Sequence, residues 1–252
     1  MRLSCFIFFC ILLALVSCKK DAVIPPPDLG YNYYPGTIKS YVIYDVDSIS
    51  YRQVQGDTLK YKFQIQEVMD TLIADNENRP TIKLIRYRKN YSSTIPYSQM
   101  TWTLQSVWVA NKTTTSVQEV EQNLRYTKLA FPVNVNATWN GTAFADTSQP
   151  ASLYTNVDVP IAAGGNTFTY AAVDVPLTLN GISFGKALTV LQFYNANALT
   201  YQNYYEQYAR GVGLVYKHIE NYTYAQSGGV IQQGAIAGGL YYTMTINSYG
   251  GQ

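Results

Sequence analysis

Apolar and polar side chains alternate with a period of two along most of the chain, and this pattern predicts β-strands. The clearest case is residues 59–66, where apolar residues alternate with lysine and glutamine. A strand of this kind packs its apolar face on a core and leaves the other face in water. We therefore expect Phe63 and Ile65 in the core, and Lys62 and Gln64 in solvent.

The preceding strand changes phase, because its apolar residues alternate up to Val46 and resume at Ile49. A slip of one residue turns every following side chain to the opposite face, so we expect a β-bulge near Asp47. Turns are expected at residues 55–57 and 76–80. Strands are also expected at residues 81–89, 102–110, 117–133, 153–159, 168–175, 187–194, 197–210 (where a helix is the alternative), 212–224 and 240–248, with a polar loop at 228–239.

Successive strands without helical crossovers predict an all-β fold. We expect residues 31–252 to form a single antiparallel β domain with a strongly curved sheet, either an open half-barrel or a sandwich. Residues 154–168 and 170–184 repeat a Tyr-x-x-Val-Asp-Val-Pro pattern followed by a glycine turn. Each copy is interpreted as a hairpin whose first strand ends at Pro160 or Pro176. Duplication and chance convergence both explain the similarity.

The first 17 residues have the plan of a signal peptide, with Arg2 ahead of a short apolar run. The run ends in Leu-Val-Ser-Cys, which resembles the lipobox of bacterial lipoproteins and places the lipid on Cys18. Residues 18–30 then form a tether that contains three consecutive prolines. Lys19 does not signal retention in the inner membrane, so we expect the outer membrane. Its periplasmic and surface faces are both open.

Composition narrows the classes of function. Charged residues make up 13% of the chain, about half of the usual ~25%. Removal of Arg2 with the signal peptide leaves 17 basic against 16 acidic side chains. This balance argues against a nucleic-acid partner, which would need a basic stripe. The cysteines other than Cys18 lie within the signal peptide, so we expect no disulfide.

One motif suggests a hydrolase. Residues 181–185 read Gly-Ile-Ser-Phe-Gly, and Glu206 and His218 follow in the order of an α/β-hydrolase triad. That motif requires a parallel strand before Ser183 and a helix after it, whereas Asn180 and Gly181 predict a hairpin turn. We therefore expect no catalytic residue and no enzyme activity.

The chain offers little to a metal ion or cofactor. It has one histidine, His218, interpreted as a packed or edge residue in an apolar row, and with Cys18 acylated the mature chain has no free thiol for a zinc site. Asp45 and Asp47 share a strand face that would hold calcium weakly, but a solvated strand face explains them more simply. We expect no metal and no cofactor.

The tryptophans are candidates for sugar binding. Trp102, Leu104 and Trp108 share one strand face and are expected in the core. Trp139 lies next to a turn, where a core position and a ligand platform are equally compatible with the sequence. It is the one ligand-binding residue that we predict.

Two stretches resemble a known group of proteins. Residues 208–217 read YARGVGLVYK, and residues 173–184 form a Val-Asp-Val-Pro hairpin that ends in Gly-Ile-Ser-Phe. Together with the lipobox, they resemble uncharacterised outer-membrane lipoproteins of the Bacteroidetes type. The resemblance implies a curved antiparallel sheet, similar to the open barrels of lipoprotein carriers, and implies no activity.

Three short matches fit the same lineage. Ser48, Thr58 and Thr71 each lie in an Asp-[Ser/Thr]-aliphatic triplet, which resembles the O-glycosylation motif of Bacteroidetes. Ordinary strand composition also produces such triplets.

Three hypotheses of function follow. The first is a non-enzymatic envelope lipoprotein, attached to the membrane through Cys18, whose β domain binds a small molecule, a glycan or another envelope protein. The second is a carrier or sensor of an apolar ligand held in an open barrel. The third is a hydrolase. A filled interior would favour the first hypothesis, and a large apolar cavity the second.

Overall fold

A computed structural model describes residues 26–53, 56–121, 123–144 and 166–251. The predicted signal peptide, Cys18, the strand expected at 153–159 and most of the first repeat copy lie outside the described residues.

Twelve strands form one antiparallel sheet, and the described residues contain no α-helix. Two short 3-10 turns, η2 (Tyr31–Tyr33) and η3 (Tyr97–Gln99), accompany the strands. The strands are β1 (Tyr41–Arg52), β2 (Asp57–Ala74), β3 (Pro80–Asn90), β4 (Thr103–Lys112), β5 (Ser116–Glu121), β6 (Leu124–Ala130), β7 (Thr138–Asn140), β8 (Thr167–Leu179), β9 (Ile182–Ala196), β10 (Thr200–Ala209), β11 (Gly213–Ser227) and β12 (Val230–Gly250).

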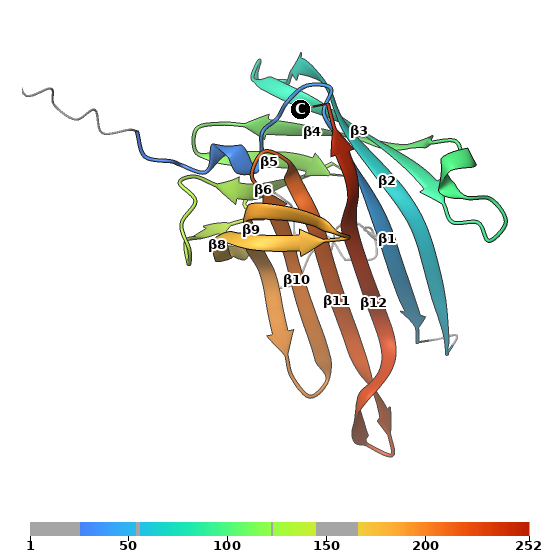
Figure 1. Ribbon diagram of the computed structural model, residues 1–252. Helices are drawn as coiled ribbons and strands as arrows, with labels where there is room; N and C mark the ends of the chain where they lie inside the picture. Colours follow the sequence, from blue (N-terminus) through green and yellow to red (C-terminus); the bar gives the residue numbers. More distant parts are fainter. Residues whose placement is uncertain (1–25, 54–55, 122, 145–165, 252) are drawn as a thin grey trace, which may run out of the picture.

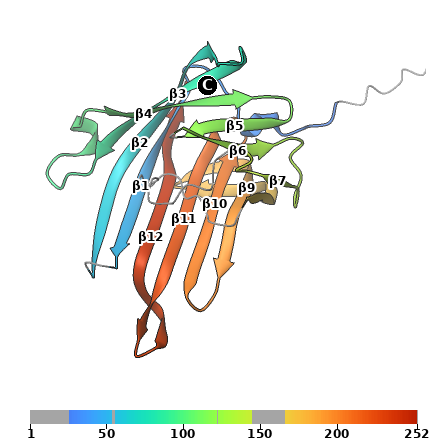
Figure 2. The same ribbon diagram turned by 180° about the vertical axis from the view of Figure 1, so that it is seen from behind.

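The sheet joins two meanders through its first and last strands. Its order is β6-β5-β4-β3-β2-β1-β12-β11-β10-β9-β8-β7, so β1 pairs with β12 at the centre. The long strands β10, β11, β12, β1 and β2 run side by side, and β4, β5 and β6 cross behind them in Figure 1 and in front of them in Figure 2. The strongly curved antiparallel sheet expected from the sequence is confirmed.

The two edge strands, β6 and β7, approach each other and nearly close the sheet into a barrel with one open seam. Thr127 N–H donates to Gly141 O at 2.8 Å, and Arg125 forms an isolated bridge with Phe144. The indole N–H of Trp139 on β7 donates to Thr127 O at 2.8 Å. These contacts link the ends of the two meanders.

The segment before β1 packs on the barrel. Tyr33 and Tyr34 are buried, Val133 N–H donates to Leu29 O at 3.1 Å, and Gly211 N–H donates to Asn32 O at 2.8 Å. Gly30 has a φ of 84°, a left-handed conformation that glycine adopts without a steric cost. The last residues of the predicted tether, Leu29 and Gly30, therefore already pack on the domain.

The apolar core has two clusters. One is formed mainly by β1, β2, β11 and β12, with contributions from β9 and β10, and it includes Phe63 and Ile65 as expected. The other is formed mainly by β3 to β6 and β8 to β10, with Tyr33 and Tyr34 from the N-terminal segment.

The predicted bulge near Asp47 is wrong. β1 pairs with β2 without interruption, and its register shift against β12 falls between Ile43 and Tyr44. The inward row therefore continues from Val46 to Ser48, which is 3% exposed, and Ile49 points to the outer face. The small side chain of Ser48 fits the inward position, so the strand needs no bulge there.

Gln64 also differs from the prediction. It is 9% exposed, because its amide donates to the carboxylate of Asp45 at 2.8 Å on the neighbouring strand.

Three boundaries were placed wrongly. Residues 117–133 form two strands, β5 and β6, with Asn123 in a left-handed conformation at the turn. Pro176 lies within β8, where repeated register shifts accommodate it, instead of ending the strand. The loop expected at 228–239 is instead the start of β12. Other expectations are confirmed: β10 is a strand, and Asn180 and Gly181 form the β8–β9 turn with φ values of 47° and 79°.

The row around Phe63 provides a test of the fold. Phe63 is 4% exposed, whereas the Lys62 side chain is 65% exposed. We expect Phe63→Ala to lower the free energy of unfolding by ~3–5 kcal/mol through lost burial and a cavity. Lys62→Ala should stay within ~0.5 kcal/mol. Chemical denaturation measures both, and equal effects would contradict the assigned faces of β2.

Candidate functional site

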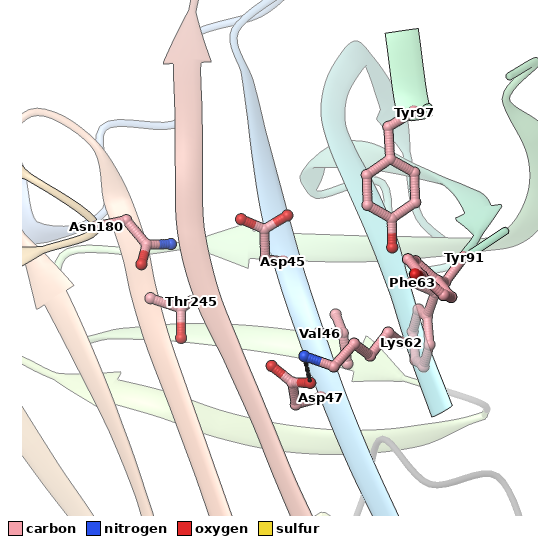
Figure 3. A pocket seen from close by; sticks show the side chains of 9 residues that line it. All are labelled: Asp45, Val46, Asp47, Lys62, Phe63, Tyr91, Tyr97, Asn180 and Thr245. Carbon is pink, nitrogen blue, oxygen red and sulfur yellow. Dashed lines mark ion pairs between the residues drawn. The ribbon is translucent and has the colours of Figure 1, made fainter. Parts of the chain in front are cut away.

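A hollow of about 340 Å³ lies on the outer face of the sheet over β1 and β2. Figure 3 shows Tyr91 and Tyr97 on one side of it and Asn180 on the other. Asp45, Asp47 and Thr245 lie between these two sides. The lining residues are Asp45, Val46, Asp47, Lys62, Phe63, Tyr91, Tyr97, Asn180 and Thr245.

The strand register brings the polar residues of the hollow together. Asp45 pairs with Thr245 of β12, and Asp47 pairs with Lys62 of β2. Directly paired residues of antiparallel strands point to the same face, so these side chains share one surface. Asn180 arrives from the β8–β9 turn, and its amide donates to Ile246 O at 3.0 Å.

The tyrosines come from the connection between β3 and β4. Tyr91 is 58% exposed, and its backbone N–H donates to Lys62 O at 2.9 Å, which fixes the connection beside β2. The rings of Tyr91 and Tyr97 pack edge to face, with centroids 6.4 Å apart. Lys89 Nζ donates to Tyr97 O at 2.8 Å and holds the turn η3 in place.

The carboxylates of the hollow are bonded to neighbouring side chains. Asp45 accepts hydrogen bonds from the amides of Gln64 and Asn247, both at 2.8 Å. Asp47 forms an ion pair with Lys62 at 3.0 Å, and this hydrogen bond raises the pKa of Lys62. Burial, with the charges of Asp45 and Asp47, raises the pKa of Tyr97. Tyr97 is therefore a neutral hydrogen-bond donor at physiological pH.

The described part of the chain contains no group of three or more histidine, cysteine or carboxylate side chains placed to hold a metal ion. The amide and ammonium donors around Asp45 and Asp47 occupy oxygens that a calcium ion would need.

The residues of the hydrolase hypothesis do not converge. Ser183 is exposed and shares a hydrogen bond with Thr178. Glu206 lies in the inward row of β10 and bonds to Lys128, whereas His218 pairs with Tyr205 on the outer face and contacts Glu220 at 3.0 Å. Ser183, Glu206 and His218 therefore each have other partners.

The tryptophans have three different environments. Trp108 is buried as expected, with the guanidinium of Arg86 3.9 Å from its ring centroid. A register shift beside Arg86 places Leu104 on the other face, where it is 63% exposed, so the expected shared row is wrong. Trp102 was also expected in the core, but it is partly exposed, and Lys89 Nζ lies over its ring, 4.4 Å from the centroid.

Trp139 packs at the seam. Its ring lies 4.5 Å from that of Tyr170 and 6.0 Å from that of Phe168, and its N–H is bonded to Thr127 O. These contacts give Trp139 a structural role in closing the barrel. Its ligand-binding role stays a prediction.

The three glycosylation candidates differ in access. Ser48 is buried, which withholds its hydroxyl in the folded domain, whereas Thr58 is exposed and Thr71 is partly exposed. The triplet motif does not distinguish the buried candidate from the exposed ones. Modification of any of the three stays a prediction.

A cluster of charged side chains occupies the barrel interior, and sequence analysis missed it. Lys128 Nζ contacts Glu206 at 2.6 Å and Glu121 at 3.0 Å. Lys217 Nζ lies 3.6 Å from Glu206. The side chains of these residues are at most 8% exposed. Period-two alternation could have predicted that Glu206 is buried, because it places Glu206 in one row with Tyr204 and Tyr208.

Two tyrosines extend this cluster. Tyr208 donates to Glu206 at 2.6 Å, and Tyr34 of the N-terminal segment donates to Glu119 at 2.8 Å. The interior cluster therefore links β5, β6, β10 and β11 to the segment that precedes β1.

Burial and neighbouring charges within the cluster shift the pKa values of two of its glutamates. Burial raises the pKa of Glu119 to about 8, because the charge of Lys128 offsets only part of the lost hydration. Burial would also raise the pKa of Glu206, but Lys128 and Lys217 outweigh it and hold that pKa at about 2. At neutral pH, Glu206 is therefore ionised and Glu119 is largely protonated.

Comparison with known proteins does not assign the chain. No protein-family model matches its sequence, and we found no similar protein of curated function and no similar solved structure. None of the helical turns in the described ranges has the length and apolar character of a helix that crosses a bilayer.

The raised pKa of Glu119 predicts a pH-dependent stability. The unfolded chain releases this proton near pH 4.5, and the folded domain keeps it to about pH 8. The folded state therefore binds more protons between these values, and stability should fall as pH rises from about 5 to 8, by up to ~1.4 kcal/mol per pH unit.

Glu119→Gln should remove this slope, because glutamine mimics the protonated acid and still accepts from Tyr34. Chemical denaturation at pH 5, 6, 7 and 8 measures the effect. The variant should match the unmodified protein at pH 5 and exceed it at pH 8, and parallel pH curves would contradict the shift.

Proposed function

We propose that the protein is a lipid-anchored envelope protein that binds carbohydrate in the hollow over β1 and β2, without catalysis. The observation that carries this proposal is the composition of the hollow: Tyr91 and Tyr97 stand opposite Asp45, Asp47 and Asn180 around one open space.

This set of groups complements a sugar. An aromatic ring has a negative face, which attracts the weakly positive C–H bonds on the face of a pyranose. Carboxylate, amide and hydroxyl groups supply acceptors and donors for the sugar hydroxyls. Tyr91, with 58% of its surface exposed, offers a ring for such stacking. An open, partly polar hollow with two aromatic rings favours a hydroxylated ligand over an apolar one.

The interior argues against the carrier hypothesis. A carrier of an apolar molecule needs an apolar lining, because a buried charge without a partner is costly. The centre of the barrel instead holds Lys128, Glu206 and Lys217 in ion pairs. The outer face is therefore the better candidate for ligand binding.

The anchor proposal rests on the lipobox-like sequence that ends at Cys18. Between Cys18 and the first contact at Asp28 lie nine residues, whose extended length of ~30 Å would keep the barrel close to the bilayer surface. Such a position suits a protein that captures glycans at the cell envelope.

Binding can be tested with glycans of defined structure. The probes are two-unit and six-unit oligomers of β-1,4-linked glucose, mannose and N-acetylglucosamine, titrated calorimetrically. For a sugar that binds, Tyr91→Ala should weaken the affinity at least tenfold, or ~1.4 kcal/mol, because the stacking ring is lost.

Two variants serve as controls. Tyr91→Phe keeps the ring and should stay within about threefold of the unmodified protein, equivalent to well under ~1.4 kcal/mol. Tyr61→Ala removes a tyrosine that is 46% exposed on β2 outside the hollow and should have no effect. Absence of binding to all probes, or equal losses in Tyr91→Ala and Tyr61→Ala, would contradict the proposal.

The anchor has a separate test. Cys18→Ala should abolish incorporation of labelled palmitate and leave the precursor uncleaved, because the acylated thiol is missing. Metabolic labelling followed by gel analysis measures both, with Cys10→Ala as the matched control. Persistent label in Cys18→Ala would show that the lipid is elsewhere.

A further inference from the structure

Aromatic side chains form a continuous array on the same outer face as the hollow. One row crosses four strands: Tyr194 of β9, Tyr201 of β10, Tyr222 of β11 and Tyr51 of β1. The successive ring centroids are 6.1, 6.2 and 5.6 Å apart. We call these four residues the tyrosine row.

A glycine completes the tyrosine row. Tyr222 pairs with Gly239 of β12, and Gly239 pairs with Tyr51. Because Gly239 has no side chain, the rings of Tyr222 and Tyr51 meet across β12. A Cβ at this position would also lie 2.0 Å from Asn221 O, so the backbone excludes other residues. The row thus continues over a strand that contributes no ring.

A second group of rings connects the tyrosine row to the hollow. Asp47 in the hollow pairs with Thr243, which pairs with His218, which pairs with Tyr205. The rings of His218 and Tyr205 stack with centroids 4.7 Å apart, and Tyr241 packs 5.7 Å from His218. The surface is therefore continuous from the hollow across β12 to β10.

The charged side chains on this surface have local partners. His218 contacts Glu220 at 3.0 Å, and Lys62 contacts Asp47 at 3.0 Å. Tyr222 OH donates to Glu220 at 3.4 Å. A surface of rings, hydroxyls and hydrogen-bonded carboxylates complements a neutral partner that is rich in hydroxyl groups, whereas Asp45, Asp47 and Glu220 would repel a polyanion.

We propose that the occupant of this face is an extended, neutral glycan chain of several sugar units, which begins in the hollow and continues over the aromatic array. The inference rests on the carbohydrate site proposed above and names its ligand class. Neighbouring strands lie ~4.8 Å apart, close to the length of one pyranose in an extended chain. A chain that crosses the strands therefore meets one strand, and often one ring, per sugar unit.

The experiment compares chain lengths on the full lipidated chain, held in a detergent without a sugar headgroup. For the sugar that binds, the six-unit oligomer should bind at least tenfold more tightly than the two-unit oligomer. Tyr201→Ala and Tyr194→Ala should each weaken binding of the six-unit oligomer at least threefold and leave the two-unit oligomer unchanged. Tyr91→Ala should weaken both oligomers.

Folding is controlled by thermal melting and by a conservative variant. Tyr194 is 58% exposed, so its loss should cost little stability. Tyr201→Phe should retain both the melting temperature and the affinity for the six-unit oligomer.

The outcomes separate the two proposals. Equal affinities for the two lengths, with no effect of Tyr194→Ala or Tyr201→Ala, would overturn the extended site and leave the hollow in place. Tyrosine-row variants that lower the melting temperature without changing affinity would also overturn it, since the rings would then only stabilise the sheet. No binding by any oligomer would overturn both proposals.

Discussion

The structure depends on the burial of charged groups at the centre of the barrel. Lys128 on β6 meets Glu206 on β10 at 2.6 Å, and neither side chain is more than 5% exposed. Removal of one partner from a buried pair typically costs ~3–5 kcal/mol, because the other charge is left without compensation. The two side chains can meet only where the sheet curves enough for β6 to face β10, and in this arrangement the edge strands β6 and β7 also meet at the seam.

The same cluster ties the N-terminal segment to the barrel. Tyr34 reaches Glu119 in the interior, and Arg210 contacts both Asp28 and Asp174 at the surface. These hydrogen bonds and ion pairs hold the chain where the predicted tether ends, so the end of the barrel that carries this segment would lie nearest the membrane. With the proposed lipid on Cys18, the packing of Tyr33 and Tyr34 would set the orientation of the domain on its anchor.

Because ion pairs occupy the interior, the proposed ligand site is on the outer face. There the sheet combines the hollow beside Tyr91 with tyrosines from β9, β10, β11 and β1. Aromatic pairs across antiparallel strands also stabilise a sheet by ~0.2–1 kcal/mol each, so the array supports the long strands and offers a surface at the same time. Several of the 24 tyrosines of the chain therefore lie on this face, whereas others are buried in the core.

The sequence by itself determined the antiparallel strands, the buried positions of Phe63, Ile65 and Trp108, and the turn at Asn180 and Gly181. These follow from alternation and turn chemistry, which act over a few residues. Only the tertiary structure decided that Leu104 is exposed, that Lys128 meets a carboxylate 78 residues away, and that Tyr91 faces Asp45. Alternation tells which side chains share a face, whereas register shifts and sheet curvature decide which faces meet, and both arise from pairings between distant strands.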